Sequence, residues 1–193
     1  MNSFTLDHTC LVALSHRAAE AEAIETLIVQ SRRDVLRGHV TACGTTAALR
    51  EAGYPATYRE FVDWLRLYRM DHLSQAYGIM RWGPSFWNAG VWGDDAAYAR
   101  ERRIYGILHP ADDYEWSAAV EAAGADPEER SGPAYEDWRG RVIEAQAVWA
   151  HEHVGARTYV TTDADLARRM AEGGLGGRVL SPAAACATLL PDG

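Results

Sequence analysis

The sequence predicts an α/β protein built around a central, mostly parallel β-sheet. Two stretches carry this prediction, residues 4–9 near the start of the chain and 157–163 near its end. Each reads as a short strand of β-branched and aromatic residues that ends in an aspartate and is followed by a helical pattern. Strands that alternate with helices at this spacing form right-handed βαβ units, and such units place their strands in parallel.

The first third of the chain continues this alternation. After the strand at residues 4–6, residues 10–14 begin a helical run, and residues 18–36 show the apolar periodicity of the first long helix. Gly38 ends that helix, and residues 40–43 are a plausible second strand. A short helix capped by Thr45 or Thr46 follows and is broken at Gly53-Tyr54-Pro55.

The middle of the chain, roughly residues 55–135, reads as a helical and aromatic insertion. Amphipathic or helical patterns cover residues 57–70, 94–108 and 111–123, and an acidic loop with glycine and proline covers 124–133. Residues 77–92 are rich in tryptophan among glycines and a proline. Such aromatics beside arginine can stack single-stranded bases or form an interface, but packing of the insertion against the core also explains them.

The last third contains a long helix, a glycine turn and a strand. Trp138, Val142, Ala145 and Trp149 recur at helical spacing. Gly155 suits the turn that ends this helix, and residues 157–161 read as a strand. The tail adds a strand at residues 178–180 and a last short helix.

The composition limits the possible functions. All 19 basic residues are arginine, which excludes a phosphate-loop lysine and any Schiff-base lysine. A net charge of −8 argues against a protein that coats nucleic acid non-specifically. We expect a single cytoplasmic domain over residues 1–193, with no membrane span or secretory signal, and buried thiols at Cys10, Cys43 and Cys186.

The two strand-ending aspartates, Asp7 and Asp163, are the candidate functional residues that come first. If their strands are parallel neighbours, the two side chains lie at one edge of the sheet, where α/β proteins bind ligands. The simpler interpretation is that each aspartate only caps the helix that follows it. His8, beside Asp7, reaches this edge or points to solvent, and we expect ordinary surface or packing roles for His8, His151 and His153.

At these residues the chain resembles the PIN domain family of metal-dependent nucleases. The resemblance lies in Asp7-His8-Thr9, in Glu144 on the late helix, in Thr161-Thr162-Asp163 and in the closing strand and helix from Arg178 to Pro182. Two positions depart from the family pattern. Glu144 stands where the family usually has aspartate. The expected glutamate after the second strand falls near Ala47, and the nearest acid is Glu51, one turn later.

The resemblance implies a three-layer, PIN-like fold and a ribonuclease that depends on Mg²⁺ or Mn²⁺. It implies that Asp7, Glu144 and Asp163 bind the metal and carry catalysis, with Thr9, Thr161 and Glu51 in supporting roles. Many such nucleases are toxins of toxin–antitoxin pairs, so an antitoxin-like partner or a homodimer is implied as well as an RNA substrate. A PIN-like module that has lost catalysis, or an unrelated α/β protein in which both aspartates are caps, are the alternatives.

Overall fold

The computed structural model describes residues 1–190, and its centre is a five-stranded sheet in which every strand pair is parallel. The strand order is β3-β2-β1-β4-β5. The strands are β1 (Ser3–Leu6), β2 (Arg37–Ala42), β3 (Ser74–Tyr77), β4 (Thr158–Val160) and β5 (Arg178–Leu180). The predicted α/β class with a parallel sheet is therefore confirmed.

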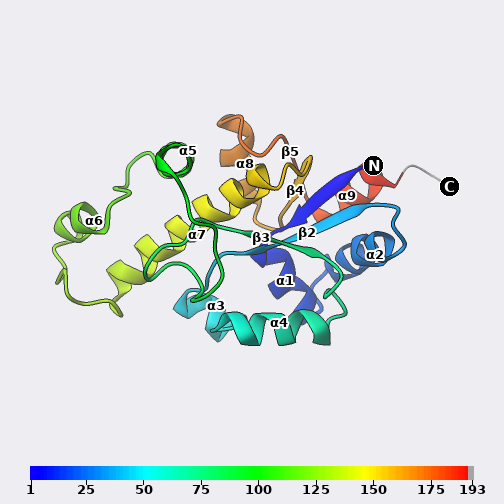
Figure 1. Ribbon diagram of the computed structural model, residues 1–193, viewed down its shortest axis with the longest axis horizontal. Coiled ribbons are helices and arrows are strands. Elements are labelled where there is room, and N and C mark those ends of the chain that lie inside the picture. Colours follow the sequence, from blue (N-terminus) through cyan, green and yellow to red (C-terminus); the bar gives the residue numbers. More distant parts are fainter. Residues whose placement is uncertain (191–193) are drawn as a thin grey trace.

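Helices cover both faces of this sheet and give three layers (Figure 1). One core contains side chains of α1 (His8–Ser15), α2 (Ala21–Arg32), α4 (Tyr58–Leu67) and α9 (Pro182–Leu189). The other contains side chains of α5 (Asp95–Leu108), α6 (Trp116–Ala123), α7 (Pro133–His153) and α8 (Ala164–Glu172). The short helix α3 (Ala47–Glu51) follows β2. Successive strand residues point to opposite faces, so Tyr159 and Val160 of β4 lie in different cores, whereas Phe4 and Leu6 of β1 both face the first.

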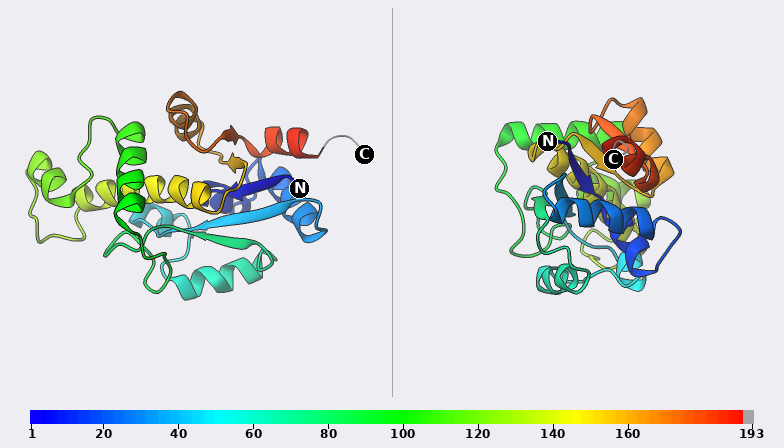
Figure 2. Two further views of the ribbon diagram at one scale, coloured as in Figure 1. Left: turned by 45° about the horizontal axis from the view of Figure 1, so that its top comes forward. Right: turned by 90° about the vertical axis from the view of Figure 1, so that its right-hand side faces the viewer.

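The molecule is elongated because α7 extends well beyond the sheet. Its C-terminal half lies against the strands, whereas its N-terminal half runs out to α6, which lies far from the sheet (Figure 2). Both α5 and α6 pack on α7. The two helices that precede α7 in the sequence, α5 and α6, therefore lie along it.

The register of the sheet brings the two aspartate-bearing strands together. β1 lies between β2 and β4, with Leu6 opposite Val160, and the backbone N–H of Asp7 donates to the Val160 carbonyl at 2.9 Å. Because the strands are parallel, their carboxyl ends share one edge. Asp7 and Asp163 therefore leave neighbouring strands at the same edge, as the sequence predicts.

One strand was not predicted. β3 pairs with β2 and forms an edge of the sheet, so the range 55–135 includes a sheet strand as well as helices. Its sequence, SQAY, has one buried residue and no alternating apolar pattern. The residues that follow β3 include three tryptophans, and all three are exposed: Trp82, Trp87 and Trp92. No helix within residues 1–190 is long and apolar enough to cross a membrane.

Candidate acidic site at the carboxyl edge of the sheet

Asp7 is a fully buried carboxylate at the end of the central strand. It occupies the position before α1, yet its side chain makes no capping hydrogen bond to that helix. Instead Oδ2 accepts hydrogen bonds from the hydroxyls of Thr9 at 3.0 Å and Thr161 at 3.1 Å. The interpretation of Asp7 as a simple helix cap is therefore wrong, since its carboxylate is turned toward β4.

His8 compensates the charge of Asp7. Its Nδ1 lies 2.8 Å from Asp7 Oδ1, the oxygen that the threonines leave free. Burial opposes the charged form of Asp7, but the His8 charge and these hydrogen bonds lower the pKa of Asp7 to about 2. Burial likewise opposes the imidazolium, but the charge of Asp7, with smaller contributions from Glu144 and Asp163, raises the pKa of His8. The expected surface or packing role is thus wrong for His8, which belongs to the acidic site.

Asp163 does cap the helix that follows it, and one of its oxygens stays free. Oδ1 accepts from the backbone N–H groups of Asp165 and Leu166, both at 2.9 Å. Its own N–H donates to the Thr161 hydroxyl at 3.1 Å, and the Thr162 N–H donates to the Thr9 hydroxyl at 3.2 Å. The two threonines therefore connect the Asp7 carboxylate to the loop that carries Asp163.

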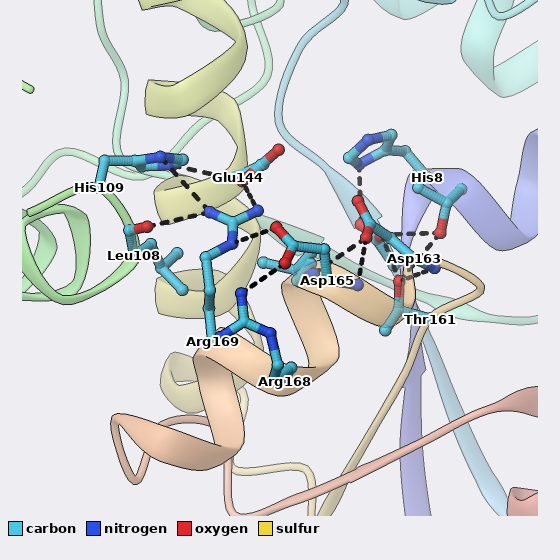
Figure 3. Close-up of polar contacts among 12 residues, drawn as sticks. His8, Leu108, His109, Glu144, Thr161, Asp163, Asp165, Arg168 and Arg169 are labelled. Atoms are coloured by element: carbon cyan, nitrogen blue, oxygen red, sulfur yellow. Dashed lines mark hydrogen bonds and ion pairs between the residues drawn. The ribbon is translucent and has the colours of Figure 1, made fainter.

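Glu144 lies on α7 and contacts two side chains of other helices and loops. Its Oε2 is 3.2 Å from Nη2 of Arg169 on α8 and 3.3 Å from Nε2 of His109, just after α5. Figure 3 shows Glu144 turned toward these two residues, apart from the group formed by His8, Thr161 and Asp163. No local sequence pattern indicates this ion pair, because it depends on how α8 packs against α5 and α7.

Glu136, from α7, occupies the position after β2 where the PIN-like pattern predicts a glutamate. Ala47 is the first residue of α3, and its N–H donates to Oε2 of Glu136, on α7, at 2.7 Å. Glu136 also lies 3.4 Å from Arg139 and 3.7 Å from Arg50. Glu51, the acid considered in the sequence, is the last residue of α3 and is exposed. The long α7 therefore supplies the acid at the start of α3.

Two carboxylates near this edge each keep one oxygen free of protein hydrogen bonds within residues 1–190, Oδ2 of Asp163 and Oε1 of Glu144. The third, Asp7, presents Oδ1 to His8. Hard carboxylate oxygens are what Mg²⁺ and Mn²⁺ prefer, so the donor chemistry fits such an ion. In the observed arrangement, however, no three His, Cys, Asp or Glu side chains of the described residues are gathered closely enough to hold one.

The remaining histidines on α7 have structural roles, as expected. His151 is buried, with Nε2 2.9 Å from the Gly176 carbonyl and Nδ1 2.9 Å from the Thr5 hydroxyl. Since the carbonyl only accepts, Nε2 carries the proton and the Thr5 hydroxyl donates to Nδ1. His153 stacks on Trp149, with ring centroids 4.5 Å apart. The thiols of Cys10 and Cys43 are buried and that of Cys186 is partly buried.

Fold and site together define an α/β protein with a parallel five-stranded sheet and two aspartates, Asp7 and Asp163, at the carboxyl edge of that sheet. No protein-family model matches this chain, and no curated protein matches it either.

Proposed function

We propose that the protein is a PIN-like nuclease that cleaves RNA with the help of Mg²⁺ or Mn²⁺. The observation that carries this proposal is Asp7, a fully buried carboxylate that does not cap its helix. Thr9 and Thr161 join it to the loop after the neighbouring strand, which carries a second aspartate. A helix cap needs no such arrangement. Divalent-metal sites need carboxylates whose orientation is fixed by further hydrogen bonds.

In this proposal each of the three acids has its own role at the metal site. Asp7 and Asp163 would hold the ion, through Oδ1 of Asp7 once the His8 ring turns aside and through Oδ2 of Asp163, and Glu144 would be the third acid. Thr9 and Thr161 fix the Asp7 carboxylate, and the two backbone N–H groups at the start of α8 fix that of Asp163. When bound, the ion polarises the phosphate and supplies a water of lowered pKa.

Cleavage of single-stranded RNA with Mn²⁺ tests the proposal directly. Asp7→Asn and Asp163→Asn should each abolish metal-dependent cleavage, while Asp63→Asn, on the exposed face of α4, should leave it unchanged. Asn replaces Asp well at a helix cap, so Asp163→Asn removes the charge without removing the cap. Cleavage that persists in Asp7→Asn would show that the activity arises elsewhere.

A second candidate is a non-catalytic, PIN-like binding module, and the ion pairs of the site favour it. His8 Nδ1 contacts Oδ1 of Asp7, and Arg169 forms an ion pair with Glu144. A cation reaches Asp7 only if the His8 ring turns aside. Mn²⁺ binding without RNA cleavage in any variant would support this module, whereas the absence of Mn²⁺ binding would support an unrelated α/β protein.

A further inference from the structure

The segment between β3 and α5, residues 78–94, exposes three tryptophan side chains. We call it the tryptophan loop; Trp82 is 81% exposed, Trp87 67% and Trp92 86%. The rings of Trp82 and Trp87 meet edge to face, with centroids 5.1 Å apart. Tryptophan is a residue that folding normally covers, so neighbouring exposed rings mark a binding surface.

The exposure of these rings is not a result of a loose loop. The Phe86 N–H donates to the Cys43 carbonyl at 2.8 Å, and Phe86 is buried against Tyr54 and Phe61. A Cβ on Gly44 would lie 1.9 Å from the Pro84 carbonyl oxygen, so only glycine permits this approach. The backbone around Trp82 and Trp87 is therefore fixed while the rings face water.

Buried polar side chains hold the start of the same loop. The Gln146 amide on α7 donates to the Ile79 carbonyl at 2.8 Å, and the Ser85 hydroxyl donates to the same carbonyl at 3.0 Å. The Arg81 N–H donates in turn to the Ser85 hydroxyl at 2.9 Å. A surface that is rigid before binding loses less entropy when a ligand binds.

The loop lies at the same sheet edge as the acidic site. It leaves the carboxyl end of β3 and pairs with Gly44, just beyond the carboxyl end of β2, while Asp7 follows β1. Aromatic contacts continue this connection, since Tyr54 packs on Phe86 on one side and on His8 on the other. In Figure 1 the loop runs beside α3 and α7, the two helices that meet at Glu136.

The charges beside Trp87 identify the ligand class. Trp87 lines a hollow with Tyr58, Phe86, Asn88, Arg59 and Arg139, and no acid lines it. The next hollow, beside Trp82, contains Arg81 and also Glu115, and Arg81 is already paired with Glu101, so the basic site is the hollow beside Trp87. Aromatic rings for bases and arginines for phosphates are the features that bind single-stranded nucleic acid. This hollow is basic in a chain of net charge −8, which favours a phosphate-bearing ligand over a protein surface.

We propose that Trp82 and Trp87 form a stacking platform on which single-stranded RNA docks on its way to the acidic edge. The exposed Arg59 contacts its phosphates, while Arg139, which lies 3.4 Å from Glu136, lines the floor of the hollow. The proposal deepens the proposed nuclease function and rests on it for the choice of RNA, but docking itself requires no metal and no cleavage.

Binding is measured by the fluorescence anisotropy of a labelled oligouridine, with EDTA present so that metal-dependent cleavage is absent. Trp87→Ala should weaken binding between about fivefold and a hundredfold, and Trp87→Phe should recover part of the loss. Arg59→Gln should reduce the slope of log affinity against log salt by about 0.7. Leu67→Ala removes an equally exposed apolar side chain from α4 and should change neither quantity.

Equal binding by wild type and Trp87→Ala would overturn the proposal, as would a lack of oligouridine binding at low salt. Self-association that Trp87→Ala abolishes, without RNA binding, would identify a protein interface instead and also overturn it. RNA binding that depends on Trp87, without cleavage under Mn²⁺, would support the platform and contradict the nuclease. RNA cleavage that Trp87→Ala leaves unchanged would support the nuclease and contradict the platform.

Discussion

The ion pair between Arg81 and Glu101 offers the sharpest test of how the tryptophan loop is held. Glu101, on α5, is fully buried, and its Oε1 accepts from the Tyr114 hydroxyl at 2.6 Å and lies 3.7 Å from Arg81 Nε. The Arg81 guanidinium also lies 4.3 Å above the Tyr114 ring. Burial raises the pKa of Glu101, while the Tyr114 hydrogen bond and the Arg81 charge oppose that rise. Arg81 is thus the cation that makes this buried charge tolerable.

Arg81→Met keeps the apolar stem and removes the charge. Removing one partner of a buried ion pair costs about 3 to 5 kcal/mol, because the other charge stays buried without compensation. That is a large part of the roughly 5 to 15 kcal/mol that stabilises a typical domain. The measurement is urea unfolding followed by circular dichroism, which gives the free energy of unfolding and its denaturant slope.

A second substitution separates the charge from the packing. Glu101→Gln still accepts from Tyr114 but carries no charge, so it should restore about 2 kcal/mol or more to the Arg81→Met protein. Arg66→Met, which breaks the exposed pair with Asp63, is the matched control and should cost less than about 1 kcal/mol. The reasoning is refuted if Arg81→Met costs no more than Arg66→Met, or if the double variant loses the sum of the two single losses.

Three further predictions concern the acidic edge and the core. Saturating Mn²⁺, at about 100 times its dissociation constant, should add about 2.7 kcal/mol to the stability and raise the melting temperature, and Asp163→Asn should remove this response; equal responses in thermal-shift curves would count against the site. Burial lowers the pKa of His151 and of His39, so the unfolded chain takes up protons first. Stability should therefore fall as the pH drops below about 6.5, a loss that His151→Gln reduces and His153→Gln does not, as urea titrations across this range can measure. Glu136→Gln should slow RNA cleavage about tenfold if this acid supports the metal site, Ala47→Glu should raise cleavage if an acid is missing there, and Glu51→Ala should have no effect because its side chain is exposed.

The sequence predicted the parallel sheet and the position of Asp7 and Asp163 at one edge of it because both follow from local patterns. A strand that ends in an aspartate and opens a helix is visible in a few residues, and alternating strands and helices imply the parallel arrangement. β3 was missed because an edge strand of four residues, with one of them buried, carries no apolar alternation.

Local sequence patterns do not predict which side chains pair with the acids. His8 is the first residue of α1, so the chain has already turned and its ring folds back on Asp7 instead of following the strand. Arg169 reaches Glu144, and Glu136 reaches α3, only through the packing of helices that are distant in the sequence. Such contacts depend on tertiary geometry, which one sequence does not reveal.

The central position of β1 also has a consequence for how the chain folds during synthesis. Phe4 pairs with Thr158, so one side of β1 has no partner strand until 154 further residues have been made. At about 5 to 20 residues per second, the ribosome needs roughly 8 to 30 s to deliver that strand. The sheet therefore closes late in synthesis. The acidic edge assembles only then, because Asp7 and Asp163 are far apart in the sequence.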